Sequence, residues 1–109
     1  MADVKSITDA TFKEEIANGP VIVDFWAPWC QPCKQIAKEL DILAAKYPQV
    51  RIVKLNVDEN QQNVRELSIT SIPALVFFPK SGAPLGVMGM ASAKTIASKF
   101  DLDTVVGTR

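Results

Sequence analysis

Two cysteines separated by two residues, Cys30 and Cys33, carry the strongest chemical signal in the sequence, which contains no other cysteine. They lie between a β-branched and aromatic run at 21–26 and an apolar pattern of helical spacing that ends at Tyr47. A helix that begins at this motif brings its positive dipole end and free N–H groups close to Cys30, and these stabilise a thiolate. We therefore predict that Cys30 is the nucleophile. Cys33, one turn deeper, is predicted to resolve a mixed disulfide formed on Cys30.

Two other uses of the cysteine pair are weaker. A purely structural disulfide that closes so short a loop adds only about 2 kcal/mol by the chain-entropy argument. A structural zinc site usually needs four nitrogen or sulfur ligands, and the chain offers two cysteines and no histidine, so only a metal shared between two chains would fit. The absence of histidine also excludes hydrolases with a histidine base and histidine-ligated metal or haem sites.

The composition is that of one domain spanning 1–109. Twelve Lys and Arg balance twelve Asp and Glu, so the formal net charge is zero, which argues against nucleic acid or a membrane surface as a partner. No apolar stretch is long enough to span a bilayer, and neither a signal peptide nor a Gly-rich nucleotide-binding motif is present. We expect a cytoplasmic monomer that binds no cofactor and no metal.

Alternating strands and helices must position the cysteines. The predicted strands are 4–7, 21–26, 50–57, 74–78 and 85–88. The predicted helices are one that opens within 8–11 and ends at 18–20, one that begins at the Cys30–Cys33 motif and ends at Tyr47, a short one ending at 67, and one over 93–100. Thr11 begins a capping-box pattern, and Asp58 or Asn60 is predicted to cap the short helix. This order predicts an α/β fold with a central mixed β-sheet and helices on both faces, whereas 101–109 carry no clear pattern.

The sequence resembles the thioredoxin family from its first strand to about Phe100. The resemblance is carried by VDFWAPWCQPCK at 23–34, KLNVD at 54–58 and SIPA at 71–74. It implies the thioredoxin fold and a thiol–disulfide oxidoreductase that reduces protein disulfides through a Cys30–Cys33 dithiol. It also implies two kinds of partner, namely disulfide-containing proteins and a thioredoxin reductase that supplies reducing equivalents from NADPH for electron transport and cell redox homeostasis.

The resemblance gives roles to two charged residues. Asp24 lies within an apolar strand, on the face of Ile22 and Trp26, so we expect it to be buried with a raised pKa. The family has a buried acid at this position, which implies that Asp24 assists deprotonation of Cys33; the alternative is a buried Asp satisfied by hydrogen bonds. Lys54 matches the family lysine beside that acid and would modulate it, unless its ammonium simply extends into water.

The resemblance also implies a substrate-binding surface around the cysteines. Its members are Trp29, Gln31, Pro32, Ile72, Pro73, Met88 and Gly89. Pro73 matches the family's cis-proline, and the backbone of Ile72 would pair with an extended substrate strand. Trp29, next to the nucleophile, would supply apolar contact area. The alternative is that Trp29 packs in the core.

Two departures from the family pattern leave other functions open. Gln31 stands where glycine is usual, and Ala74 stands where many relatives have threonine. The added side chain at the mouth of the site is compatible with a disulfide isomerase or oxidant of less negative potential. A third possibility is a subunit that binds a partner through Trp29 and Ile72 irrespective of redox state.

Overall fold

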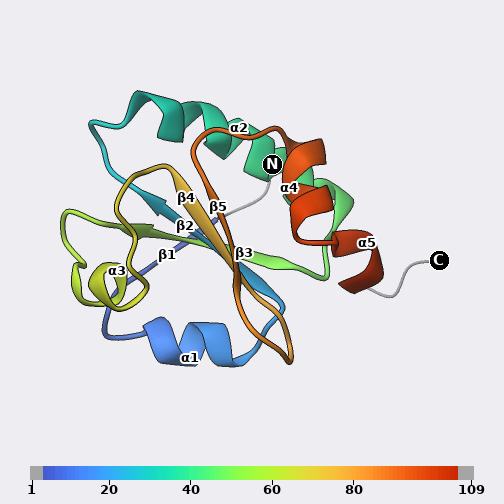
Figure 1. The fold of residues 1–109 in the computed structure, drawn as a ribbon, viewed down its shortest axis with the longest axis horizontal. Helices are drawn as coiled ribbons and strands as arrows, with labels where there is room; N and C mark the ends of the chain where they lie inside the picture. The colour runs from blue at the N-terminus through green and yellow to red at the C-terminus, as the bar shows by residue number, and fades with distance from the viewer. Residues whose placement is uncertain (1–3, 106–109) are drawn as a thin grey trace.

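A mixed β-sheet forms the centre of the protein (Figure 1). Within residues 4–105, which the computed structural model describes, five strands are ordered β1-β3-β2-β4-β5. The strands are β1 (Lys5–Ile7), β2 (Val21–Trp26), β3 (Arg51–Asn56), β4 (Ala74–Phe78) and β5 (Leu85–Met88). β1, β3 and β2 run parallel, whereas β4 is antiparallel to both β2 and β5. The predicted mixed sheet is confirmed.

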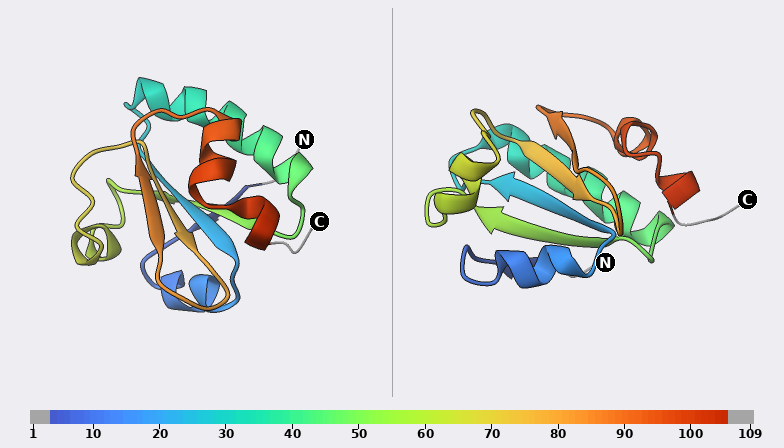
Figure 2. Two further views of the ribbon diagram at one scale, coloured as in Figure 1. Left: turned by 45° about the vertical axis from the view of Figure 1, so that its right-hand side comes forward. Right: turned by 60° about the horizontal axis from the view of Figure 1, so that its bottom comes forward.

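Helices cover both faces of this sheet, as predicted (Figure 2). They are α1 (Phe12–Ala17), α2 (Gln31–Lys46), α3 (Gln62–Glu66), α4 (Ala93–Lys99) and α5 (Leu102–Val105). α2 and α4 pack on one face, and α1 lies on the opposite face. α2 begins at the cysteine motif, as predicted, so both cysteines lie at its N-terminus. No helix in the described part of the chain is both long enough and apolar enough to cross a bilayer.

β2 lies between β3 and β4 and is buried on both sides. Ile22 belongs to the cluster under α2 and α4, whereas its neighbours Val21 and Val23 belong to the cluster on the α1 face. This alternation follows from the two-residue period of a strand. The same period places Asp24 on the face of Ile22, beneath α2, within an otherwise apolar interior.

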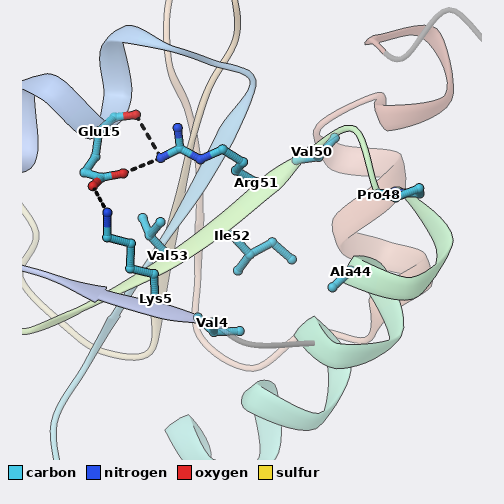
Figure 3. Close-up of a pocket in the computed structure, with 9 residues that line it drawn as sticks. All are labelled: Val4, Lys5, Glu15, Ala44, Pro48, Val50, Arg51, Ile52 and Val53. Atoms are coloured by element: carbon cyan, nitrogen blue, oxygen red, sulfur yellow. Dashed lines mark hydrogen bonds and ion pairs between the residues drawn. The ribbon is translucent and has the colours of Figure 1, made fainter. Parts of the chain in front are cut away.

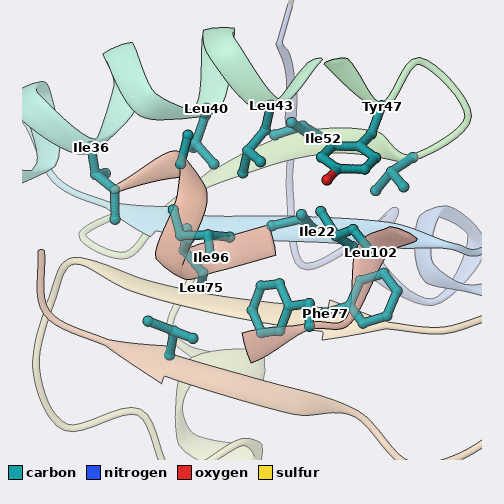
Figure 4. Close-up of a cluster of buried hydrophobic side chains, with 14 residues drawn as sticks. Ile22, Ile36, Leu40, Leu43, Tyr47, Ile52, Leu75, Phe77, Ile96 and Leu102 are labelled. Atoms are coloured by element: carbon teal, nitrogen blue, oxygen red, sulfur yellow. The ribbon is translucent and has the colours of Figure 1, made fainter. Parts of the chain in front are cut away.

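The larger cluster fills the space between the sheet and α2 (Figure 4). Ile36, Leu40 and Leu43 follow one another at helical spacing along α2, and each is at most 2% exposed. On the sheet they face Ile22 and Phe77, whose ring stacks on that of Phe100 at 5.3 Å between centroids. The packing of these three side chains on the sheet fixes the position of α2 and therefore the position of its N-terminus.

The capping box predicted at Thr11 is wrong. Thr11 is the N-cap residue of α1, but its side chain makes no hydrogen bond to the helix. Its backbone has φ −105° and ψ 0°, whereas capping side chains usually project from extended backbone. The Thr11 hydroxyl instead accepts a hydrogen bond from the N–H of Thr8 at 3.2 Å.

The cap predicted for α3 is also wrong, because neither Asp58 nor Asn60 caps this helix. The carboxylate of Asp9, in the loop between β1 and α1, accepts hydrogen bonds from the backbone N–H groups of Gln62 and Asn63 at 3.1 and 3.2 Å. The side chain of Asn60 accepts from the N–H of Asp9 at 2.8 Å and so joins the same two segments. α5 occupies part of the range that carried no prediction, and 106–109 lie outside the described residues.

Candidate active site

The two cysteines lie at the junction between β2 and α2 and form a disulfide, with their Cα atoms 5.3 Å apart. Cys30 is the N-cap residue of α2, with extended backbone, and its sulfur accepts a hydrogen bond from the N–H of Cys33 at 3.2 Å. Gln31 and Pro32 form the exposed start of the helix, where the missing N–H of a proline costs no hydrogen bond.

Burial does not distinguish the two cysteines, because Cys30 is 3% exposed and Cys33 is 4% exposed. Their helix positions do. The sulfur of Cys30 accepts a hydrogen bond from the N–H of Cys33, which has no partner within the helix. The positive end of the helix dipole lies beside the same sulfur. A helix N-terminal N–H and the dipole end are the groups that favour a thiolate over a thiol. The geometry therefore fits the predicted order of attack, in which Cys30 acts first.

The loop before β4 packs against the cysteines. Cys30 and Cys33 form a small buried cluster with Ala27, and Ile72 is one of the partly buried residues that contact it. The peptide bond between Ile72 and Pro73 is cis. The structure thus brings the 71–74 segment to the cysteines, although about 40 residues of chain separate them.

The end of β5 is joined to the same loop. Gly89 has φ +85°, a conformation that favours glycine, and its N–H donates to the carbonyl oxygen of Pro73 at 2.8 Å. Met88 precedes it, pairs with Ala74 in the β4–β5 register and is 50% exposed. Met88 and Gly89 are therefore neighbours of Pro73, as the predicted substrate surface requires.

Trp29 lies on the surface, not in the core, with 68% of its area exposed. Its indole N–H donates to both carboxylate oxygens of Asp58, at 3.2 and 3.1 Å. Asp58 is a residue of the site that the sequence reasoning missed, since it was considered only as a helix cap. A signal was present, because Asp58 ends the KLNVD segment that carries the family resemblance.

Asp24 is buried, with 4% of its area exposed. Burial raises its pKa to about 7, and the positive charge of Lys54, its register partner on β3, opposes part of that rise. Its Oδ1 atom is buried without a hydrogen-bond partner among the described residues. The structure therefore does not show the alternative, in which protein hydrogen bonds satisfy both oxygens of Asp24.

A cavity of about 180 Å³ connects this carboxyl group to the active site. Asp24 and Cys33 both line it, together with Lys54 and Trp26. The Lys54 ammonium lies 5.2 Å from the centre of the Trp26 ring, a cation–π contact, so this lysine does not simply extend into water. The residues that line this cavity thus include both a cysteine of the disulfide and an ionisable group with a strongly raised pKa.

A second cavity, of about 440 Å³, lies away from the cysteines between β1, β3 and the end of α2 (Figure 3). At its edge Glu15 of α1 forms ion pairs with Lys5, at 2.6 Å, and with Arg51. Its hydrogen bond to Lys5 is the main cause that lowers the pKa of Glu15. The two ion pairs join α1 to β1 and β3, and neither cysteine lines this cavity. Among residues 4–105 no group of three or more His, Cys, Asp or Glu side chains is placed to hold a metal ion.

Comparison with known protein families places the sequence among thioredoxins. The family model described as Thioredoxin matches residues 3–101. Thioredoxin 1 of Synechococcus elongatus is 41% identical over 104 residues, which cover 93% of this chain and 97% of that protein. The thioredoxin of Staphylococcus aureus is 44% identical over 103 residues, with the same two coverages of 93% and 97%.

Comparison with solved structures gives the same result. A chloroplastic thioredoxin z superposes with a TM-score of 0.83 at 31% identity and covers 95% of this chain and 97% of its own. The oxidized form of mitochondrial thioredoxin 3 from Saccharomyces cerevisiae superposes with a TM-score of 0.80 at 30% identity, covering 91% and 95%. These structures share the mixed sheet and its flanking helices.

Proposed function

The chain belongs to the thioredoxin family, and on this premise we propose that it reduces disulfides in other proteins and that Cys30 and Cys33 do so in that order. Membership of the family and a Cys-X-X-Cys pair at disulfide distance make the chain a thiol–disulfide oxidoreductase. The observation that supports the order is the hydrogen bond from the Cys33 N–H to the Cys30 sulfur at the start of α2.

The reaction has two exchange steps. The Cys30 thiolate attacks one sulfur of a substrate disulfide, and the electron pair of the broken S–S bond leaves on the other substrate sulfur, which takes up a proton. The Cys33 thiolate then attacks the Cys30 sulfur of the mixed disulfide. The substrate sulfur that was bonded to Cys30 leaves as a thiolate, and the Cys30–Cys33 disulfide seen in the structure is the product.

Asp24 is proposed to accept the proton that Cys33 loses in the second step. A pKa of about 7 means that the carboxyl group exchanges a proton readily near neutral pH. The shared cavity is large enough for water, which needs about 30 Å³ per molecule, so a proton can pass between the two groups without direct contact. Lys54 opposes the pKa rise and is proposed to set how strongly Asp24 acts as a base.

The substrate surface is proposed to be the rim around the disulfide. Trp29, Met88 and Gly89 lie beside the cysteines or the Pro73 loop, and the exposed Gln31 and Pro32 complete the rim. The backbone of Ile72 is proposed to pair with an extended segment of the substrate. Such pairing recognises backbone and not a particular side chain, which suits many protein substrates.

The direction of the reaction is proposed to be reduction. A cation between the cysteines would stabilise the thiolate further and make the disulfide more oxidising. Gln31 and Pro32, the residues between the cysteines, are uncharged, so this effect is absent there. The family implies a reductase partner and disulfide-containing substrates. We further propose that NADPH supplies the electrons through a thioredoxin reductase, and that the chain acts as a monomeric single domain in a reducing cytoplasm.

The reduction potential of the Cys30–Cys33 pair tests the direction. The protein is equilibrated with thiol redox buffers, and each 30 mV corresponds to about tenfold in the equilibrium constant. A value of about −270 mV supports a reductant, whereas a value of about −180 mV or higher would assign the chain to isomerases or oxidants. A variant with both cysteines changed to serine tests the binding alternative, because a binding subunit keeps its partner and a reductase loses all turnover.

A further inference from the structure

Two methionines flank the glycine that contacts the Pro73 loop. The sequence contains three methionines, and Met88 and Met90 lie on either side of Gly89. They are 50% and 46% exposed, whereas Val87, one residue earlier, is only 9% exposed. Gly89 is hydrogen-bonded to Pro73, and the preceding residue, Ile72, packs against the cysteines, so the two methionines flank a residue joined to the rim of the disulfide site.

These side chains differ from Trp29, another large exposed apolar residue of the rim. Trp29 is rigid and is held by its hydrogen bonds to Asp58. Met88 and Met90 have flexible, polarisable thioether side chains, which adapt to apolar surfaces of varied shape. They also carry sulfur in side chains that are about half exposed, where small oxidants can reach them. Cys30 and Cys33, in contrast, are at most 4% exposed and are bonded to each other in the oxidised protein.

Resting on the proposed function, we propose that Met88 and Met90 form a modification site where hydrogen peroxide or an alkyl hydroperoxide switches off the docking of protein substrates. The thioether sulfur attacks one peroxide oxygen, the O–O bond breaks, and an S–O bond forms. Each sulfur loses two electrons to become a sulfoxide. The other peroxide oxygen takes up the protons and leaves as water or an alcohol.

Methionine sulfoxide at these two positions is expected to weaken substrate binding without changing the chemistry of the dithiol. A sulfoxide is polar and hydrated, so burying it against an apolar substrate surface loses the favourable contact and adds a desolvation cost. The hydrogen bond at Cys30 and the Asp24 cavity involve neither methionine. Oxidation is therefore expected to raise KM for protein disulfides by about tenfold, which corresponds to about 1.4 kcal/mol, while the reduction potential stays constant.

The test uses the full chain in its disulfide form, which protects the cysteines during treatment with hydrogen peroxide. The extent of oxidation at Met88 and Met90 is measured by mass spectrometry of peptides. The protein is then assayed with insulin as the protein disulfide, with dithiothreitol as the electron donor. In a second assay the protein is reduced, freed of dithiothreitol and mixed with 5,5′-dithiobis(2-nitrobenzoate) as a small disulfide in a single turnover. We expect KM for insulin to rise and the rate with the small disulfide to remain unchanged.

A variant carrying Met88→Leu and Met90→Leu is the matched control, and it is compared only with its own untreated form. Peroxide must leave its KM for insulin unchanged, and methionine sulfoxide reductase must restore the treated parent protein. A rise of equal size in the leucine variant would overturn the proposal, as would a reduction potential that shifts together with KM. Untreated protein that fails to reduce insulin would instead refute the proposed function, so the two failures are distinguishable.

Discussion

The buried carboxyl group of Asp24 makes the oxidised protein less stable as pH rises, and Asp24→Asn removes that dependence. The folded pKa is about 7 and the reference value is 3.8. Below the reference value both states are protonated, and Asp24 imposes no penalty. Between the two values the unfolded chain has released the proton and the folded chain has not, so the free energy of unfolding falls with increasing pH. Above pH 7 both states are ionised, and the penalty is complete and constant.

The size of the effect follows from the pKa difference. A shift of one unit corresponds to about 1.4 kcal/mol, so the full penalty is about 4 kcal/mol, of which about 2 kcal/mol develops between pH 5 and 7. Asp24 is 4% exposed, so solvent screens little of this penalty. The chain has no histidine, and the disulfide removes both thiols, so few other groups titrate in this range. The slope is therefore attributable to Asp24.

Urea unfolding of the oxidised protein at pH 5, 6, 7 and 8 measures the slope. The parent protein should lose about 3 kcal/mol across this range, and D24N should lose almost none and be the more stable of the two at pH 8. Glu59→Gln, which removes an exposed carboxylate, is the control and should keep the parent slope. If D24N retains the full slope, the raised pKa of Asp24 is refuted, and with it the reason for assigning it a proton-transfer role.

Three further outcomes test other contacts. Asp9→Ala removes the carboxylate that accepts from the N-terminus of α3, so urea unfolding should show a loss of about 1 kcal/mol, and no loss would mean that this cap is not important. Asp58→Ala removes the hydrogen-bond acceptors of the Trp29 indole, so the fluorescence of Trp29 should shift. KM for insulin should rise about threefold, because a hydrogen bond contributes about 0.5–1.5 kcal/mol, and the reduction potential should stay unchanged. Gly19→Ala places a Cβ 2.6 Å from the carbonyl oxygen of Phe78, so its melting temperature should fall, and a parent-like value would contradict that close approach.

Much of the fold could be predicted because its signals are local. β2, β4 and β5 have the predicted bounds, since β-branched and aromatic runs end there at Gly, Pro or Ser residues that favour turns. Helical spacing predicted the apolar stripe of α2 as far as Tyr47, and the Cys30 motif with Pro32 predicted where this helix begins.

The candidate site was only partly predictable. Residue types and spacing pointed to the cysteine pair, and the two-residue period of β2 predicted the burial of Asp24. The surroundings were not predictable in this way. The partner of Trp29 was missed and the cap of α3 was assigned to the wrong residue, because both hydrogen bonds join residues that are 29 or more positions apart.

The sequence by itself determined the chemistry, because two thiols spaced for one helical turn at a helix N-terminus need only local geometry to become a redox pair. Tertiary structure alone decided what surrounds that pair. It placed Asp24 in the same cavity as Cys33, joined Gly89 to Pro73, and so brought the methionines to the rim. The physical reason is that such contacts depend on which strands are neighbours in the sheet, and neighbouring strands are set by packing of the whole core and not by the pattern within any one segment.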